Sequence, residues 1–424
     1  MVSLRHLRRS LVFIVGLGLG AAAHAQSQPP TYPALDAKEE EELARQWRDL
    51  KRRRPDDSSR ALYGFVLTAL AHAWQPKTVT EAIALAEELH DSDPASPGYG
   101  NYRWYWHDTA PNDLNAVQFC MQEASLAWIL YRDRLDDAGR AKLSEALALG
   151  AKGVVRQKVP VSYTNIFLMK AANAILIGQS TGRPELAQQG KAWFQDWLDY
   201  TRANGNHEFS SPTYYGVDAE DLGSLVLYAQ DPLIREKASK ALVFLWTDIA
   251  ANWFEPHQGI SGANSRDYGF LLGHGYLDQH LGRSGWIKGP VEGESRPVLD
   301  DITHVSPPPG IREQWGKLPR MVSQQYGPTP AERAFHYVGR HFSLGSAGKA
   351  YGAQDRMLAL TFDGGPKQPI ASFALDYRGD PYGQGKVDTS HGHGKLTHLV
   401  PLIATVQRQA EVLQAVYLDP AHTP

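Results

Sequence analysis

The chain of 424 residues has a single cysteine and few clustered basic residues. Cys120 is its only cysteine, which excludes an internal disulfide framework and a cysteine-based metal site. Cys120 lies in an apolar helical pattern, so we expect a buried, unreactive thiol. Beyond the N-terminal 25 residues, residues 51–54 are the one basic run, and the formal charge of the whole chain is −3. These features argue against nucleic acid as a partner.

Long hydrophobic runs are also missing. No segment beyond the N-terminus approaches the roughly 20 apolar residues that a membrane-spanning helix requires, so we expect no membrane span. At the N-terminus, residues 1–9 carry three arginines, residues 11–19 are apolar, and Ala23-His-Ala25 fits a small-x-small cleavage site. We therefore predict a signal peptide over residues 1–25 and an exported protein, periplasmic or extracellular. Its removal lowers the formal charge from −3 to −6.

Apolar residues recur at helical spacing through the first two thirds of the chain, in blocks broken by Gly, Pro, Asp and Asn. Successive helices joined by short turns pack as antiparallel pairs. A run of such pairs closes most naturally into an α/α toroid, so we expect a mostly α fold with an incomplete α/α toroid over residues 26–284. The predicted helices are 38–53, 58–74, 79–89, 113–132, 137–154, 164–178, 184–204, 214–228 and 232–252.

Proline and glycine dominate residues 285–327, which we predict to be a linker. Beyond it the apolar period changes to two, which predicts a C-terminal antiparallel β-domain over residues 328–424. The last predicted strand region could instead be an amphipathic helix. Lys395 stands where a helix cap is expected and Pro401 interrupts the pattern, so strands are favoured. The predicted strand regions are 336–344, 357–362, 370–377 and 396–417.

The segment richest in chemistry is residues 204–216, Asn-Gly-Asn-His-Glu-Phe-Ser-Ser-Pro-Thr-Tyr-Tyr-Gly. It brings His207, Glu208, Tyr214 and Tyr215 together just before a helical pattern resumes. A histidine and a phenol held side by side can move protons at neutral pH. β-Elimination of a uronic-acid polysaccharide needs such a pair, a base for the C5 proton and an acid for the departing glycosidic oxygen.

A toroid and a β-domain, with an asparagine on an inner helix, a loop histidine, a tyrosine entering the next helix and then an arginine, resemble the toroid-plus-β-sheet polysaccharide lyases. This group includes chondroitin AC lyases and heparinase III-like and alginate-lyase-like enzymes. The resemblance covers most of the chain in architecture but only short stretches in motif. It implies catalytic roles for Asn165 in Ser-Tyr-Thr-Asn-Ile-Phe, His207, Tyr214 or Tyr215, and Arg266 in Gly-Ala-Asn-Ser-Arg-Asp-Tyr-Gly.

Two patterns compete for the tyrosine. Ser-Pro-Thr-Tyr214 resembles the Ser-Pro-x-Tyr of heparinase III-like lyases, whereas Tyr215-Gly resembles the Tyr-Gly that opens the helix in chondroitin lyases. Adjacent helical residues point about 100° apart, so only one of them can face the cleft. We favour Tyr214.

The expected roles follow from the charge that develops. Asn165, with Arg266, would neutralise the uronate carboxyl group as the C5 proton leaves. His207 or the ionised tyrosine would act as base, and the tyrosine would also protonate the leaving oxygen. A free tyrosine has a pKa of about 10, so a neighbouring cation such as Arg266 would have to lower it. This mechanism requires no cofactor and no metal.

A second dense segment, Asn-Tyr-Arg-Trp-Tyr-Trp-His-Asp over residues 101–108, offers aromatic faces for pyranose rings and cations for a carboxylate. The same aromatic residues could instead pack the loop onto the toroid. His391-Gly-His393 has no third obvious ligand, so we predict no metal site. The predicted substrate-binding residues are Arg103, Trp104, Tyr105, Trp106, His107, Glu208 and Tyr268.

Two other functions stay open from the sequence. An α/α-toroid glycoside hydrolase would use Glu208 with Asp218 or Asp221 as paired carboxylates. A glycan-binding protein would hold the same polymer without cleaving it. The leading prediction is an exported lyase that acts on an acidic, uronate-containing polysaccharide.

Overall fold

A computed structural model describes residues 30–267, 273–291, 295–351, 355–364, 370–372, 387–388, 395–396 and 402–417. The predicted signal peptide, Tyr268 and the His391-Gly-His393 pair lie outside the described residues. Among the helices of the described residues, none is long and apolar enough to cross a membrane.

The long helices lie where the apolar periodicity predicts them, and local signals explain several of their starts. Asp36 caps the first helix in a capping box with Glu39, and Asp136 accepts a hydrogen bond from the backbone N–H of Gly139. These helices are α1 (Ala37–Leu50), α2 (Ser59–Ala71), α3 (Pro76–Glu87), α4 (Ala116–Tyr131), α5 (Asp137–Arg156), α6 (Thr164–Ser180), α7 (Pro184–Asn204), α8 (Tyr214–Tyr228) and α9 (Pro232–Asn252).

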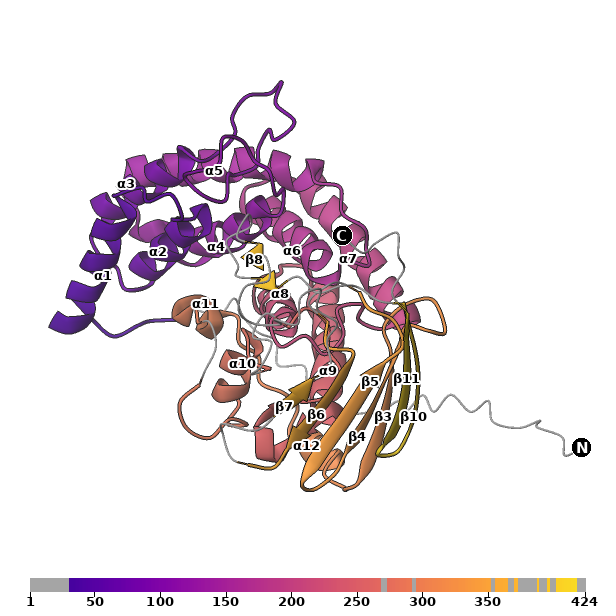
Figure 1. The fold of residues 1–424 in the computed structure, drawn as a ribbon. Coiled ribbons are helices and arrows are strands. Elements are labelled where there is room, and N and C mark those ends of the chain that lie inside the picture. Colours follow the sequence, from indigo (N-terminus) through magenta and orange to yellow (C-terminus); the bar gives the residue numbers. More distant parts are fainter. Residues whose placement is uncertain are drawn as a thin grey trace, which may run out of the picture.

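The helices form two layers of an incomplete toroid (Figure 1). Helices α2, α4, α6 and α8 contact one another in that order and make the inner layer. Each packs against the following helix, so α3, α5, α7 and α9 make the outer layer. Most of α4, α6 and α8 is buried on every side, which is why polar residues on these helices are enclosed rather than solvated.

Residues 285–327, predicted as a linker, contain regular structure that the sequence analysis missed. Helices α11 (Pro297–Ile302) and α12 (Ile311–Gln314) lie there, preceded by α10 (Leu277–Arg283). Helix α11 contacts both α2 and α8, the two ends of the inner layer, and buries Val298, Leu299 and Ile302 in the core. These helices span one to two turns, too short for a helical period to show in the sequence.

A five-stranded antiparallel sheet follows, in the order β3-β4-β5-β6-β7, as the change of period predicts. Two boundaries differ from prediction. Strand β3 lies entirely inside the predicted linker. The expected strand 336–344 contains the turn between β4 and β5, where Gly339 interrupts the strand. The strands are β3 (Arg320–Gln325), β4 (Arg333–Val338), β5 (Phe342–Ala347), β6 (Leu358–Phe362) and β7 (Ile370–Ser372).

Two-stranded pairs complete the sheets of the described residues. Strands β10 (Leu402–Arg408) and β11 (Glu411–Tyr417) form a hairpin, so strands rather than a helix occupy the end of the region 396–417. β10 lies against β5. The remaining pairs are β1 (Trp253–Phe254) with β2 (Gly259–Ile260) and β8 (Val387–Asp388) with β9 (Lys395–Leu396).

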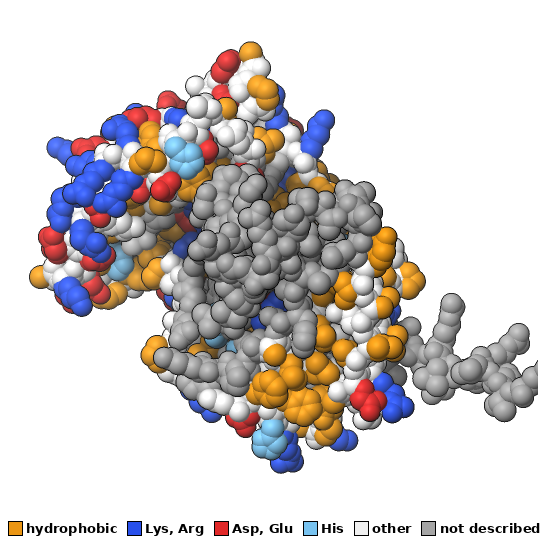
Figure 2. All heavy atoms as spheres, in the orientation of Figure 1, with side chains coloured by type: hydrophobic (Ala, Val, Ile, Leu, Met, Phe, Trp, Pro, Cys, Tyr) orange, Lys and Arg blue, Asp and Glu red, His pale blue; other side chains and the backbone are white. Residues whose placement is uncertain are grey.

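The sheet is fixed to the helical part by polar and aromatic contacts. Arg320 Nε donates to the carbonyl oxygen of Ala251 at 2.8 Å, at the end of α9. His336 Nδ1 lies 3.0 Å from Asn252 Oδ1. The rings of Phe209 and Tyr326 stack at 4.0 Å. Figure 2 shows charged side chains over the end of the molecule that holds α1, and apolar side chains over the sheet. Because Phe209 belongs to the loop before α8 and Tyr326 follows β3, their stacked rings hold this loop against the sheet.

Candidate active site

Glu208 joins three segments that are distant in the sequence. Its carboxylate is completely buried. Oε2 accepts hydrogen bonds from the backbone N–H of Asn165 and from Thr164 Oγ1, both at 2.9 Å. Oε1 pairs with Arg266 Nη1 at 2.8 Å. The carboxylate thus holds the N-terminus of α6, a favourable place for an anion, against the loop that carries Arg266.

The Arg266 guanidinium lies between two phenol rings. Its central carbon is 4.3 Å from the ring centre of Tyr214 and 5.1 Å from that of Tyr163. The backbone of Arg266 has a positive φ of 47°, and its N–H donates to Asp355 Oδ1 at 2.9 Å. A left-handed non-glycine residue is costly and is typical of functional sites. The fold therefore places one cation against Tyr214 and Glu208 together.

Asn165 is buried beside this pair on the first turn of α6. Neither its side-chain nitrogen nor its side-chain oxygen has a hydrogen-bond partner among the described residues. A buried amide without partners is costly, by about 1 to 3 kcal/mol per group. Such a group is suited to binding a polar atom of a ligand.

His207 lies at the rim of the cluster and is half-buried. Its Nδ1 is 3.4 Å from Tyr200 Oη, and its ring meets the Tyr351 ring edge to face at 4.8 Å. Burial lowers the pKa of His207, opposed mainly by the negative charges of Glu332 and Glu208. The imidazole is thus neutral at neutral pH, the state that a base requires.

Tyr214 and Tyr215 have different surroundings. The Tyr215 hydroxyl is buried, donates to Asp248 Oδ2 and accepts from Gln324 Nε2 at 3.0 Å. Burial and the negative charge of Asp248 raise the pKa of Tyr215 well above its usual range. Tyr214 instead faces Arg266. The two side chains point apart, as their adjacent places on a helix require.

The carboxylates of α8 belong to the enclosed inner layer. Asp218 accepts from Asn206 Nδ2 at 2.8 Å, and Asp221 accepts from Gln122 Nε2 at 3.0 Å. Burial raises the pKa of both well above the usual range of an aspartate. Both therefore lie within the helical core.

The aromatic segment divides between two environments. Trp104 packs on Phe119, in the same apolar cluster as Tyr214 and Tyr276. The other predicted binding residues contact their own loop or its neighbours: Arg103 donates to the carbonyls of Asp108 and Glu88, Tyr105 stacks on His107, the Arg53 guanidinium lies over Trp106, and His107 contacts the carbonyl of Pro55. Trp104 therefore lies in the apolar cluster that contains Tyr214, whereas the rest of the segment contacts its own loop and neighbouring loops.

Several members of the cluster were not predicted from the sequence. Tyr163 and Thr164 immediately precede Asn165, so their place in the motif was a usable signal. Tyr351 and Asp355 come from the β-part, and nothing local connects them to residue 207 or 266. Burial raises the pKa of Tyr163, opposed by Arg266, and burial also raises the pKa of Tyr351. Both are neutral phenols at neutral pH.

The other described ligand-type residues do not come together as a metal centre: in those parts of the chain, no three His, Cys, Asp or Glu side chains are placed to hold an ion. Cys120 is buried, its thiol donates to Ser59 Oγ at 3.4 Å, and burial raises its pKa. The expected burial of this thiol is confirmed.

Residues 81–278 match a family model described as a domain of unknown function, DUF8769. The match begins within α3, ends within α10 and includes Asn165, His207, Tyr214 and Arg266, while the C-terminal sheet lies outside it. No curated protein matches the chain significantly.

Proposed function

We propose that this protein is an exported polysaccharide lyase that cleaves a uronate-containing glycan by β-elimination. The observation that carries the proposal is the Arg266 guanidinium, held against the Tyr214 ring by buried Glu208. Asn165, whose backbone N–H donates to the same carboxylate, adds a buried side-chain amide with no hydrogen-bond partner among the described residues. A cation, an amide and a phenol in one cluster match the three demands of the reaction.

In the proposed reaction the base removes the C5 proton of the uronate, and negative charge develops on its carboxyl group. Arg266 and Asn165 stabilise that charge. The C4–O bond then breaks as the C4–C5 double bond forms, and Tyr214 protonates the leaving oxygen. His207, kept neutral by burial, supplies the base. The uronate carboxylate would engage Arg266 on the side away from Glu208, since Glu208 already binds one edge of the guanidinium.

The packing disfavours the hydrolase alternative. Hydrolysis needs two carboxyl groups that reach the glycosidic bond or a water molecule. Glu208 is occupied by Arg266, Thr164 and the backbone of Asn165. Asp218 and Asp221 are buried within the inner layer. All three therefore stabilise the fold in this proposal.

A panel of acidic polysaccharides tests the function. A lyase generates an unsaturated uronate that absorbs at about 235 nm, with one new reducing end for each double bond. Tyr214→Phe serves as the matched blank, because it removes one oxygen from a packed ring. New reducing ends without the absorbance would establish hydrolysis instead. Binding without new ends would establish a glycan-binding protein.

N-terminal sequencing of the exported protein tests cleavage after residue 25.

A further inference from the structure

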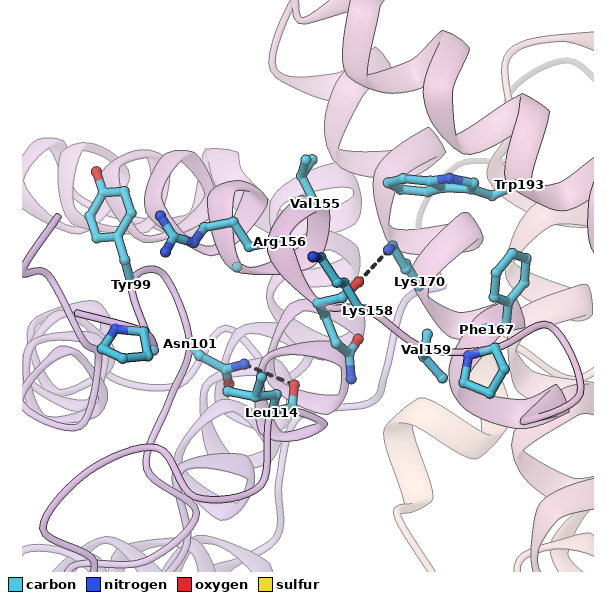
Figure 3. Close-up of a pocket in the computed structure, with 15 residues that line it drawn as sticks. Tyr99, Asn101, Leu114, Val155, Arg156, Lys158, Val159, Phe167, Lys170 and Trp193 are labelled. Atoms are coloured by element: carbon cyan, nitrogen blue, oxygen red, sulfur yellow. Dashed lines mark hydrogen bonds between the residues drawn. The ribbon is translucent and has the colours of Figure 1, made fainter. Parts of the chain in front are cut away.

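A cavity lies on the other side of α6 from the candidate active site. It has a volume of about 790 Å³ and opens between the end of α5, the start of α6, α7 and the loop at residues 97–101. Ligand pockets commonly have volumes of roughly 300 to 1,000 Å³. Figure 3 shows the side chains of Lys158 and Lys170 extending in the same direction, with the end of Lys170 next to the Trp193 ring.

The cavity is separate from the catalytic cluster because of helix geometry. Its lining includes Phe167 and Lys170 from α6. A helix turns about 100° per residue, so these two side chains point to nearly the opposite face from Asn165. A ligand in this cavity would not touch the cluster around Arg266.

The charge of the lining is one-sided. Among the described residues that form it, Arg156, Lys158 and Lys170 are cationic, and none is an aspartate or glutamate. The remaining walls are largely apolar or aromatic, with Tyr99, Phe167 and Trp193 among them. An anion with an apolar ring face matches such a lining.

Lys170 makes the anion preference specific. The residue is only 6 % exposed, and its ammonium nitrogen lies 4.1 Å from the centre of the Trp193 ring. The nitrogen donates to the carbonyl oxygen of Gln157 at 2.5 Å, but no described carboxylate pairs with it. Burial lowers the pKa of Lys170. A buried ammonium without a counter-charge is costly, and a bound anion would offset that cost.

A purely structural role accounts for part of this arrangement. Gln157 caps α5, so the bond from Lys170 satisfies a carbonyl group at the negative end of that helix. That role does not explain Lys158, which is exposed at the mouth of the cavity and forms no ion pair with a described residue. Lys158 therefore separates binding from helix capping in an experiment.

We propose that this cavity is a second, non-catalytic binding site for a uronate unit of an acidic glycan. Lys158 and Lys170 hold the sugar carboxylate, and the aromatic walls contact the apolar face of the ring. The class of sugar rests on the proposed function, whereas the preference for an anion rests on the lining alone. In the lyase, the site would hold a distant part of the polysaccharide while another part is cleaved in the active site that contains Arg266.

Titration calorimetry of the full protein with sodium glucuronate tests the site, with glucose and sodium sulfate as probes of ring and charge alone. Lys158→Gln should weaken glucuronate binding about tenfold, the usual effect of losing one charged hydrogen bond. The matched control is Lys152→Gln, an exposed lysine on α5 outside the cavity, which should leave the affinity unchanged.

Three outcomes would overturn the proposal: no glucuronate binding, equal affinities of Lys158→Gln and Lys152→Gln, or sulfate binding as tightly as glucuronate. The binding measurement needs no turnover, so its result is independent of the lyase reaction. Glucuronate binding that depends on Lys158, in a protein that never forms unsaturated product, would refute the lyase and keep the site. Formation of unsaturated product without Lys158-dependent glucuronate binding would support the lyase and refute the second site. In an active lyase, Lys158→Gln should raise KM for long polymers and leave kcat on short oligomers unchanged.

Discussion

At the scale of single residues, neighbouring side chains of the same type have different physical roles. Tyr214 and Tyr215 are adjacent, yet one ring faces a guanidinium and the other hydroxyl is bonded to a buried carboxylate. Burial alone does not distinguish them, because both are buried. Their partners do, and those partners come from segments far away in the sequence.

The tyrosine pair gives a matched test of the mechanism. Tyr214→Phe should lower turnover by roughly 10²- to 10⁴-fold, the usual effect of removing a general acid, with little loss of stability. Tyr215→Phe should keep its turnover per folded molecule and lose about 1 kcal/mol of unfolding free energy, because Gln324 still bonds to Asp248. Steady-state rates at 235 nm and urea unfolding measure both quantities for each variant. If Tyr215→Phe were inactive and Tyr214→Phe fully active, Tyr215 would be the general acid instead.

Glu208 gives the second residue-scale prediction. Glu208→Gln removes the charge that compensates buried Arg266, so unfolding free energy should fall by about 3 kcal/mol, the typical cost of breaking a buried ion pair. Urea unfolding at constant pH measures this change. Glu255→Gln, at a partly exposed carboxylate, is the control and should shift stability by less than about 1 kcal/mol. Full stability with abolished hydrolysis in Glu208→Gln would instead support a catalytic carboxylate.

At the scale of elements, close backbone contacts decide which helices can pack. Gly153 near the end of α5 lies against Gly100, and a Cβ atom on Gly153 would be 2.0 Å from the carbonyl oxygen of Gly100. The loop before α4 can approach α5 only because neither residue has a side chain there. This contact also fixes one wall of the cavity that contains Lys158.

We therefore expect Gly153→Ala to destabilise the protein although alanine favours helices. The clash involves backbone, which cannot rotate away, so overpacking should cost about 1 to 3 kcal/mol. Thermal unfolding provides the measurement. Lys152→Ala, at the preceding exposed position, should change stability by about 0.5 kcal/mol or less. Equal stability of the two variants would show that the loop moves away from α5 at little cost.

At the scale of the whole molecule, the sheet and the toroid are joined through buried polar groups. His336 on β4 is the clearest example, with Nδ1 at Asn252 Oδ1 and Nε2 at 3.2 Å from Ser261 Oγ. Burial, together with the charge of Arg320, lowers the pKa of His336 to about 3. The junction therefore requires a neutral imidazole.

This junction should weaken in acid. An unfolded histidine has a pKa of about 6.5, so between that value and about 3 the unfolded state binds the proton and the folded state does not. Stability from His336 is complete above pH 6.5 and is lost as the pH falls through this window. The loss amounts to about 2 kcal/mol between about pH 7.5 and about pH 5.

Urea unfolding of the wild type and of His336→Gln at both pH values isolates this contribution, because the other ionisable groups are shared. The wild type should lose about 2 kcal/mol more than the variant on acidification. Parallel losses in the two proteins would show that His336 titrates normally in the folded state.

The local pattern of the sequence was enough to place the long helices, the change to β-structure and the segment that holds His207 and Tyr214. Helical period and caps act within a few turns, so they can be recognised without the fold. The short helices α10 to α12 and strand β3 were missed, because so few residues carry no measurable period. Their positions depend on the surfaces they cover, as α11 shows by contacting both α2 and α8.

The sequence by itself determined which residues are candidates for chemistry, because side-chain type and local spacing are properties of the chain. Only the tertiary structure decided their partners. Glu208 pairs with Arg266 across 58 positions, and Asp355 positions Arg266 from the β-part. Such contacts form where packed elements bring buried charges within hydrogen-bond distance. The different partners of Tyr214 and Tyr215 follow from the same packing, which brings Arg266 to one ring and Asp248 to the other hydroxyl.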